Sequence, residues 1–199
     1  MNMPACPFCA TALAGKPGLA RSIVWVYRSI IDRRDAKCHH HYLDIMNEII
    51  TAEMASRHAA VLARSYQHWT GRPLMPENLA RCELAAGLFN APFVLVSHGT
   101  EADPVLNYGN QAALTLWEMT WDELTSTPSR LTAEAPNREE RARLLDQVTR
   151  QGFIDNYSGV RISKSGRRFR IERAIVWNLL ADTGQVCGQA ATFAQWEFL

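Results

Sequence analysis

The alternation of apolar and polar residues is clearest toward the end of the chain, where it predicts a meander of three antiparallel strands. The predicted strands are Tyr157–Ser163, Arg168–Leu180 and Gln185–Gln195. Two short turns, Lys164–Gly166 and Asp182–Gly184, separate them. Glycine at the end of each turn suits the positive φ that a tight hairpin needs.

The middle strand of this meander changes its pattern half-way along. Phe169 and Ile171 alternate with polar residues, which predicts one buried and one exposed face. From Ala174 to Trp177 every residue is apolar. This half of the strand is therefore expected to be covered on both faces, with Ala174 and Val176 on the outer one.

A second group of short strands is predicted earlier in the chain. Phe93–Val96 is an apolar run typical of a buried strand, and Ser97–Pro104 is rich in residues that form turns. Val105–Tyr108 predicts the next strand, and Asn110 stands at the N-cap position of a helix. Together with the meander, these strands predict a five-stranded antiparallel sheet.

Capping signals predict short helices between the two groups of strands. Thr120 and Glu123 form a capping box, with a threonine at the N-cap and a glutamate three residues on. Asn137 caps another helix, which ends at Gly152. We therefore expect an α+β fold in which short helices cover one face of the sheet.

Apolar stripes with helical spacing precede the first strand. They predict helices at Ala20–Arg34, Tyr42–Trp69 and Asn78–Leu88, with a break near Thr51 left open. The stripe of the second helix consists of Met54, Val61, Leu62, Tyr66 and Trp69. We expect this stripe to cover the outer face of the sheet, in the same subunit or exchanged with a partner in a dimer.

The first 18 residues are rich in proline and glycine and show no period, which is typical of an irregular leader. Thiolates and imidazoles suit zinc, and a tetrahedral site could form here. Its ligands would be Cys6, Cys9, Cys38 and His41. Incidental cysteines are the preferred alternative, because Cys-x-x-Cys alone is a motif of low specificity. A natural start at Met46 or Met54 is a further alternative.

Composition narrows the class of protein only a little. The chain has 199 residues, of which 47% are hydrophobic, and its net charge is +1. These values favour a folded core, and they give no reason to expect nucleic acid or a membrane as partner. Five cysteines without a secretory signal favour reduced thiols and a cytoplasmic location.

Several local motifs resemble one family closely. The matching stretches are S-H-G-T-E-A-D-P, L-W-E-M-T-W-D-E-L, Y-S-G-V-R-I-S-K-S-G-R-R-F-R-I and C-G-Q-A-A-T-F. They resemble the MEKHLA domain, a PAS-related family found as stand-alone proteins and at the C-terminus of plant class III homeodomain–leucine zipper proteins. The resemblance covers roughly Met54 to Trp196.

The resemblance implies a PAS-like fold and a particular division of the chain. We expect a leader and helical extension at residues 1–52, a helical cap at 53–90 and the PAS-like core at 91–197. The implied function is a non-enzymatic sensory or regulatory module that binds a small molecule or a protein partner. The partner would be a second copy of the chain or a separate signalling protein. A pure dimerisation module with a self-filled pocket is the alternative.

A PAS pocket would lie between the inner face of the sheet and the short helices. Its expected lining includes indoles, amides and a guanidinium, which suit a planar or carboxylate ligand. The candidate residues are Asn107, Tyr108, Trp117, Trp121, Arg130, Tyr157, Phe169, Trp177 and Gln189, with Val96 and Ile171 beside them. Filling of the core by Trp117 and Trp177 is the simpler interpretation of those two residues.

Flavin-binding blue-light PAS domains offer a second resemblance, which fails at one position. They carry Asn-Cys-Arg-Phe-Leu-Gln, whereas this chain has a serine, Ser129, at the place of the reactive cysteine. A neutral hydroxyl is a far poorer nucleophile than a thiolate. We therefore expect no covalent flavin chemistry, although a non-covalent ligand is possible.

Two further clusters invite a functional interpretation. His98 lies near Glu101 and Asp103, which could support acid–base chemistry in a small enzyme, but no nucleophile motif accompanies them. A solvated turn is the stronger interpretation. A basic hairpin, formed by Arg161, Lys164, Arg167, Arg168 and Arg170, could bind an anion or an acidic partner. A solvated face is again the default.

Overall fold

The computed structural model describes residues 36–76, 79–133 and 138–199. The chain divides into two compact units, residues 1–49 and residues 50–199, and the second carries the whole sheet. The helices are α2 (Ala36–Thr70), α3 (Arg81–Phe89), α4 (Gln111–Trp117), α5 (Trp121–Thr125), the 3-10 helix η1 (Ser129–Thr132) and α6 (Arg138–Gln151). The predicted helix at Ala20–Arg34 lies outside the described residues.

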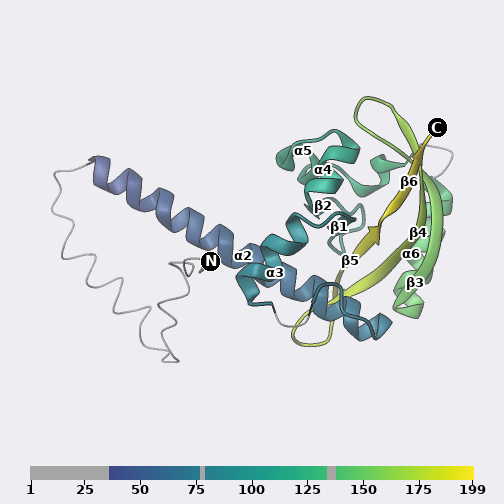
Figure 1. Ribbon diagram of the computed structural model, residues 1–199, viewed down its shortest axis with the longest axis horizontal. Coiled ribbons are helices and arrows are strands. Elements are labelled where there is room, and N and C mark those ends of the chain that lie inside the picture. The colour runs from purple at the N-terminus through teal and green to yellow at the C-terminus, as the bar shows by residue number, and fades with distance from the viewer. Residues whose placement is uncertain (1–35, 77–78, 134–137) are drawn as a thin grey trace, which may run out of the picture. The chain divides into compact units, whose positions relative to one another are not determined.

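The strands form one antiparallel sheet (Figure 1). They are β1 (Val94–His98), β2 (Leu106–Gly109), β3 (Phe153–Ile162), β4 (Arg168–Leu180), β5 (Val186–Phe193) and β6 (Gln195–Phe198). The order across the sheet is β2-β1-β5-β4-β3, and the short β6 pairs with the first half of β4. The five expected strands are all present, and β6 is an addition that the sequence pattern did not predict.

Asn110 fixes the start of α4 beneath the sheet. Its side chain is fully buried, and its Oδ1 accepts hydrogen bonds from the amides of Ala113 and Leu95 at 3.1 and 3.0 Å. Its Nδ2 donates to the carbonyl of Phe93 at 2.7 Å. One side chain therefore caps the helix and anchors it to β1, as the N-cap pattern predicted.

The part of α2 that belongs to the second unit covers one face of the sheet, which we call the outer face. Ala59, Leu62 and Tyr66 are buried in one cluster with Trp177 and Leu179 of β4. The predicted cover of the sheet by this helix is confirmed, within one chain. The break near Thr51, which the sequence left open, does not occur, because α2 is continuous there. One predicted detail was wrong: Met54 is 66% exposed.

Hydrogen bonds fix α2 along the sheet. The indole Nε1 of Trp69 donates to the carbonyl of Asn178 at 2.9 Å, and the amide of Leu180 donates to Oγ of Ser65 at 2.8 Å. These bonds satisfy polar groups that the apolar interface would otherwise leave without partners. They set the position of the helix as well as its orientation.

A bulge in β4 reverses which residues face the helices. Arg173 has φ of 51°, and two residues of β4 there oppose one residue of β3. An extra residue shifts the alternation by one position. Ala174 therefore belongs to the core on the other, inner face, and Val176 also lies there, whereas Trp177 faces α2. The expectation that Ala174 and Val176 face outward was wrong for this reason.

The inner face packs against the short helices. Its core joins residues of the sheet, among them Val94, Phe169 and Phe193, to Leu116 and Trp117 of α4. The capping box at the start of α5 is formed as predicted, because the amide of Thr120 donates to Glu123 at 2.9 Å. The sheet thus separates a helical layer at its inner face from α2 at its outer face.

Candidate functional site

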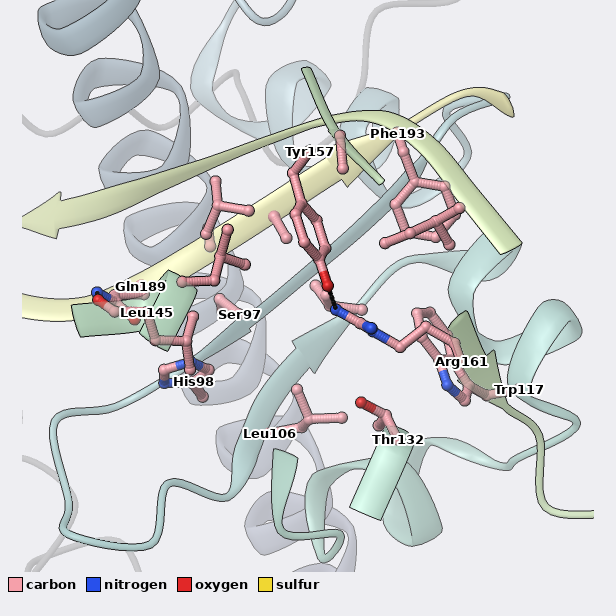
Figure 2. Close-up of a pocket in the computed structure, with 17 residues that line it drawn as sticks. Ser97, His98, Leu106, Trp117, Thr132, Leu145, Tyr157, Arg161, Gln189 and Phe193 are labelled. Carbon is pink, nitrogen blue, oxygen red and sulfur yellow. Dashed lines mark hydrogen bonds between the residues drawn. The ribbon is translucent and has the colours of Figure 1, made fainter. Parts of the chain in front are cut away.

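A cavity of about 60 Å³ lies within the inner face of the sheet. Side chains from β1, β2, β3, β4, β5, α4, η1 and α6 enclose it (Figure 2). The lining residues include Val96, His98, Leu106, Trp117, Thr132, Leu144, Leu145, Tyr157, Arg161, Ile171, Ala174, Val176, Gln189, Ala191 and Phe193. We call it the inner cavity, and most of its wall is apolar.

The polar side of the inner cavity is built on β3. Tyr157, Gly159 and Arg161 alternate along one side of the strand, and Nη2 of Arg161 donates to the phenol oxygen of Tyr157 at 3.2 Å (Figure 2). Gly159 leaves the room for this contact, because a Cβ there would collide with that oxygen. Arg161 is only 7% exposed.

Trp117 contributes an indole to the same wall. Its ring meets Phe169 and Phe193 edge-on, with centroids 5.5 and 6.2 Å apart, so packing fixes its orientation. The side chain is 3% exposed, and Nε1 has no hydrogen-bond partner among the residues that the structure describes. A buried donor of this kind is unusual and calls for an acceptor.

A polar network closes the end of the inner cavity near α6. Nε2 of Gln189 donates to Oδ1 of Asn178 at 3.0 Å and to the carbonyl of Leu145 at 3.1 Å. Nδ2 of Asn178 donates to the carbonyl of Val148 at 3.0 Å. The side-chain amide of Asn178 therefore binds the last turn of α6, and that of Gln189 binds the turn before it.

The structure places four of the predicted pocket residues at the inner cavity. Trp117, Tyr157 and Gln189 line it, and Phe169 packs directly behind Trp117. Val96 and Ile171 line it as well. Their role as ligand contacts stays a prediction.

The other predicted pocket residues lie elsewhere. Trp177 faces α2 because of the bulge in β4, and Tyr108 belongs to the same outer cluster. Trp121 is 41% exposed and meets Tyr108 edge-on. Arg130 forms a surface ion pair with Asp103, with 3.0 Å between Nε and Oδ1.

Asn107 takes part in a hydrogen-bonded chain on the outer side. Oγ of Ser97 donates to Oδ1 of Asn107 at 2.6 Å and lies 2.9 Å from Nε2 of His58. Because the hydroxyl proton of Ser97 goes to Asn107, Nε2 of His58 must donate in the bond between His58 and Ser97. Burial lowers the pKa of His58 and raises that of its neighbour Tyr108 to about 12. Both groups are neutral near pH 7.

His98 lines the inner cavity. Its Nδ1 donates to the carbonyl of Gly99 at 2.8 Å, which holds the ring against its own loop. Asp103, one of the two carboxylates considered with it, pairs with Arg130 instead. These contacts fit a structural role in the turn better than acid–base chemistry.

The tip of the basic hairpin binds back to the helices. Lys164 lies 2.6 Å from Glu123, and Arg167 lies 3.5 Å from Glu118. Hydrogen bonds from Ser165 and Ser163 hold the pKa of the Glu118 carboxyl below its ordinary value. The tip is therefore partly neutralised by its own chain.

Arg161 is the residue that sequence reasoning misplaced. The sequence pattern grouped it with the exposed basic hairpin. In the structure it lies directly opposite Phe169 in the β3–β4 register, and both side chains point inward. The predicted turn at 164–166 contained the necessary signal, because a short turn fixes the register of the pairs that flank it. Thr132, Val176 and Phe193 were also missing from the predicted lining.

The zinc hypothesis concerns residues that the structure does not describe. Cys6 and Cys9 lie outside the described residues, as do the side chains of Cys38 and His41. Within the described part of the chain, no group of three metal-ligating side chains occurs. The described helices also include none that is long and apolar enough to cross a membrane. A cytoplasmic location stays a prediction.

Comparison with curated proteins identifies plant relatives of this chain. The chain is 30% identical over 100 residues to the homeobox-leucine zipper protein ATHB-14 of Arabidopsis thaliana, covering 50% of this chain and 12% of that protein. It is 26% identical over 146 residues to HOX10 of Oryza sativa subsp. indica, covering 71% of this chain and 17% of that protein. The chain thus spans less than a fifth of the length of these relatives.

Among solved structures, the chain resembles an RNA-binding light-oxygen-voltage receptor with a TM-score of 0.51 and 18% identity. The likeness covers 60% of this chain and 34% of that one. Similarity at this level shows the fold, which is the PAS-like α+β fold expected from the sequence. The sequence model of the MEKHLA domain matches residues 56–198, and the chain belongs to the MEKHLA domain family.

Proposed function

We propose that the chain is a non-enzymatic sensory or regulatory module that binds a small molecule in the inner cavity. The observation that carries this proposal is the position of the cavity, which eight elements of the fold line together. A ligand there would contact strands and short helices at once. Its binding could therefore change how these elements pack.

Strand β4 provides a route from the inner cavity to the outer face. Val176 lines the cavity, and the next residue, Trp177, packs edge-on against Tyr66 of α2 with ring centroids 5.1 Å apart. A shift of this segment acts on both faces, because adjacent residues of a strand point in opposite directions. We propose α2 as the element that reports occupancy of the cavity to a partner.

The test compares the native protein with a variant whose cavity is filled. Ala174 is fully buried and lines the cavity, so Ala174→Leu should occupy part of its space. Denaturing mass spectrometry of both proteins, purified alike, should release a small molecule from the native protein and much less from the variant. Equal release, or no stabilising ligand for either protein in a thermal-shift screen of small metabolites, would refute the proposal.

The alternative, a dimerisation module, has one observation of its own. Trp196 and Phe198 on β6 are 36% and 46% exposed, close together at the edge of the sheet. Exposed aromatic residues favour association. Sedimentation velocity over a range of concentrations tests this alternative: a dimer that dissociates on Trp196→Ser but not on Val186→Ser would support it. Val186 is a fair control, because it is 47% exposed on β5.

A further inference from the structure

We propose that the inner cavity selects a small monocarboxylate, bound by Arg161, Tyr157 and Trp117. This inference rests on the proposed function and gives the chemical class of its ligand. It follows from three properties of the inner cavity: a buried positive charge, hydrogen-bond donors beside that charge, and a small volume with an apolar remainder.

The buried charge belongs to Arg161. Its guanidinium stays protonated at any physiological pH, yet the residue is only 7% exposed. Its hydrogen bonds go to the carbonyl of Val160 at 2.9 Å and to the phenol oxygen of Tyr157 at 3.2 Å, which are both neutral. Within the described part of the chain, no carboxylate forms an ion pair with it, whereas surface arginines such as Arg64 and Arg130 have one.

A buried charge without a counter-charge is unfavourable, and an anionic ligand would remove that cost. The guanidinium is planar and has five N–H groups, of which its protein partners use only part. Its fork matches the two oxygens of a carboxylate. The charge of Arg161 therefore predicts a negative group on the ligand.

The neighbouring polar groups are donors as well. Nε1 of Trp117 is buried without a partner, and the phenol proton of Tyr157 is free to donate because its oxygen accepts from Arg161. Thr132 offers no further donor to the cavity, since its hydroxyl donates to the carbonyl of Ser129 at 2.8 Å. Donors from three side chains favour a ligand group that accepts hydrogen bonds, and an ionised carboxylate accepts with both oxygens.

The size and the remaining wall define the rest of the ligand. A volume of about 60 Å³ would hold roughly four or five water molecules. A ligand with a similar number of non-hydrogen atoms fits this space. Leu145, Ile171 and Val176 supply apolar surface for a short alkyl group. Propionate has both parts, whereas inorganic phosphate would place charged oxygens against these apolar side chains.

The first test compares sodium propionate, propionamide and sodium phosphate at constant ionic strength. Isothermal titration calorimetry should show propionate binding at least about tenfold more tightly than propionamide or phosphate. The indole N–H resonance of Trp117, assigned by its loss in Trp117→Phe, should move on addition of propionate. Equal binding of propionate and propionamide would refute the carboxylate inference and leave the proposed function standing.

Other results separate the two proposals further. Tighter binding of phosphate, or a neutral molecule that co-purifies in the cavity while propionate fails to bind, would refute the inference alone. Failure of every probe, together with no co-purifying molecule and no stabilising metabolite, would refute the proposed function and the inference together.

The second test removes the charge. Arg161→Gln should weaken propionate binding by at least about tenfold and leave propionamide binding unchanged. Arg170→Gln, an exposed arginine on the neighbouring strand, should bind propionate like the native protein. Unchanged binding by Arg161→Gln would refute the inference. If Arg161→Gln does not fold, the comparison of propionate with propionamide in the native protein decides.

Discussion

The indole ring of Trp69 on α2 lies against the backbone of Gly152, which follows α6 in the chain. The two are so close that a Cβ on Gly152 would collide with the six-membered ring of Trp69. Gly152 also has φ of 90°, a conformation that side chains rarely adopt. Gly152 is therefore required for two independent reasons, the close contact with Trp69 and the positive φ, and substitutions can separate the two.

Gly152→Ala should destabilise the protein more than Gly166→Ala does. Gly166 has the same φ of 90°, but nothing lies within 4 Å of the position that a Cβ would take there. We expect a cost of about 1 kcal/mol for Gly166→Ala from backbone strain alone, and about 1–3 kcal/mol more for Gly152→Ala from overpacking. Urea denaturation measures both, and equal costs would show that Trp69 moves aside freely.

Leu62→Ala should test the packing of α2 on the outer face. Leu62 is fully buried in the cluster with Trp177, so its truncation should cost about 2–5 kcal/mol. Met54→Ala, in the exposed part of the same helix, should change the free energy of unfolding by less than about 0.5 kcal/mol. Similar losses from both variants would contradict the orientation of the helix.

The lowered pKa of His58 predicts that acid weakens the fold. Burial favours the neutral ring, so the unfolded chain binds a proton more readily than the folded one. The contribution of His58 is fully present above its ordinary pKa of 6.5 and is lost as the pH falls through the lowered value. His58→Gln should flatten the dependence of stability on pH in this range, measured by denaturation at a series of pH values. An unchanged slope would contradict the assignment.

Ser129 predicts that the protein forms no light-driven flavin adduct. Its hydroxyl is buried on η1, and the inner cavity is far smaller than a three-ring flavin. Illumination should leave the blue absorption band of added flavin unbleached, even in Ser129→Cys, which supplies the missing thiol. Reversible bleaching of that variant would show that the cavity opens to admit a flavin.

Residues before Met54 are predicted to be dispensable for folding of the second unit. The first described side chains that contact the sheet are His58 and Ala59, and the family match begins at residue 56. A chain that begins at Met54 should keep the circular dichroism spectrum and melting temperature of its folded part. Loss of the cooperative melting transition would contradict this prediction.

Much of the fold followed from local patterns. Asn110, Thr120 and Gly152 sit where capping chemistry predicted, because each satisfies backbone groups within a few residues of itself. The strands followed from alternation in the same way. Such signals are short-range, and they are readable without knowledge of the tertiary structure.

The faces of the strands were harder to predict. Arg173 adopts a positive φ without being glycine, so nothing in the sequence announced the bulge that turns Trp177 away from the inner cavity. Arg161 was assigned to the surface because arginine is normally exposed, although its register partner Phe169 is buried. In both cases the pairing between strands, rather than the type of residue, decided the orientation of the side chain.

Asn178 has a consequence for how the protein opens to solvent. Its side chain binds the last turn of α6, and its backbone carbonyl accepts from the indole of Trp69 on α2. Its backbone N–H donates to the carbonyl of Gly152 at 2.8 Å. Helices on opposite faces of the sheet are thus attached to one residue. Their amide protons should exchange with deuterium in a single cooperative event, so that releasing either helix exposes the other.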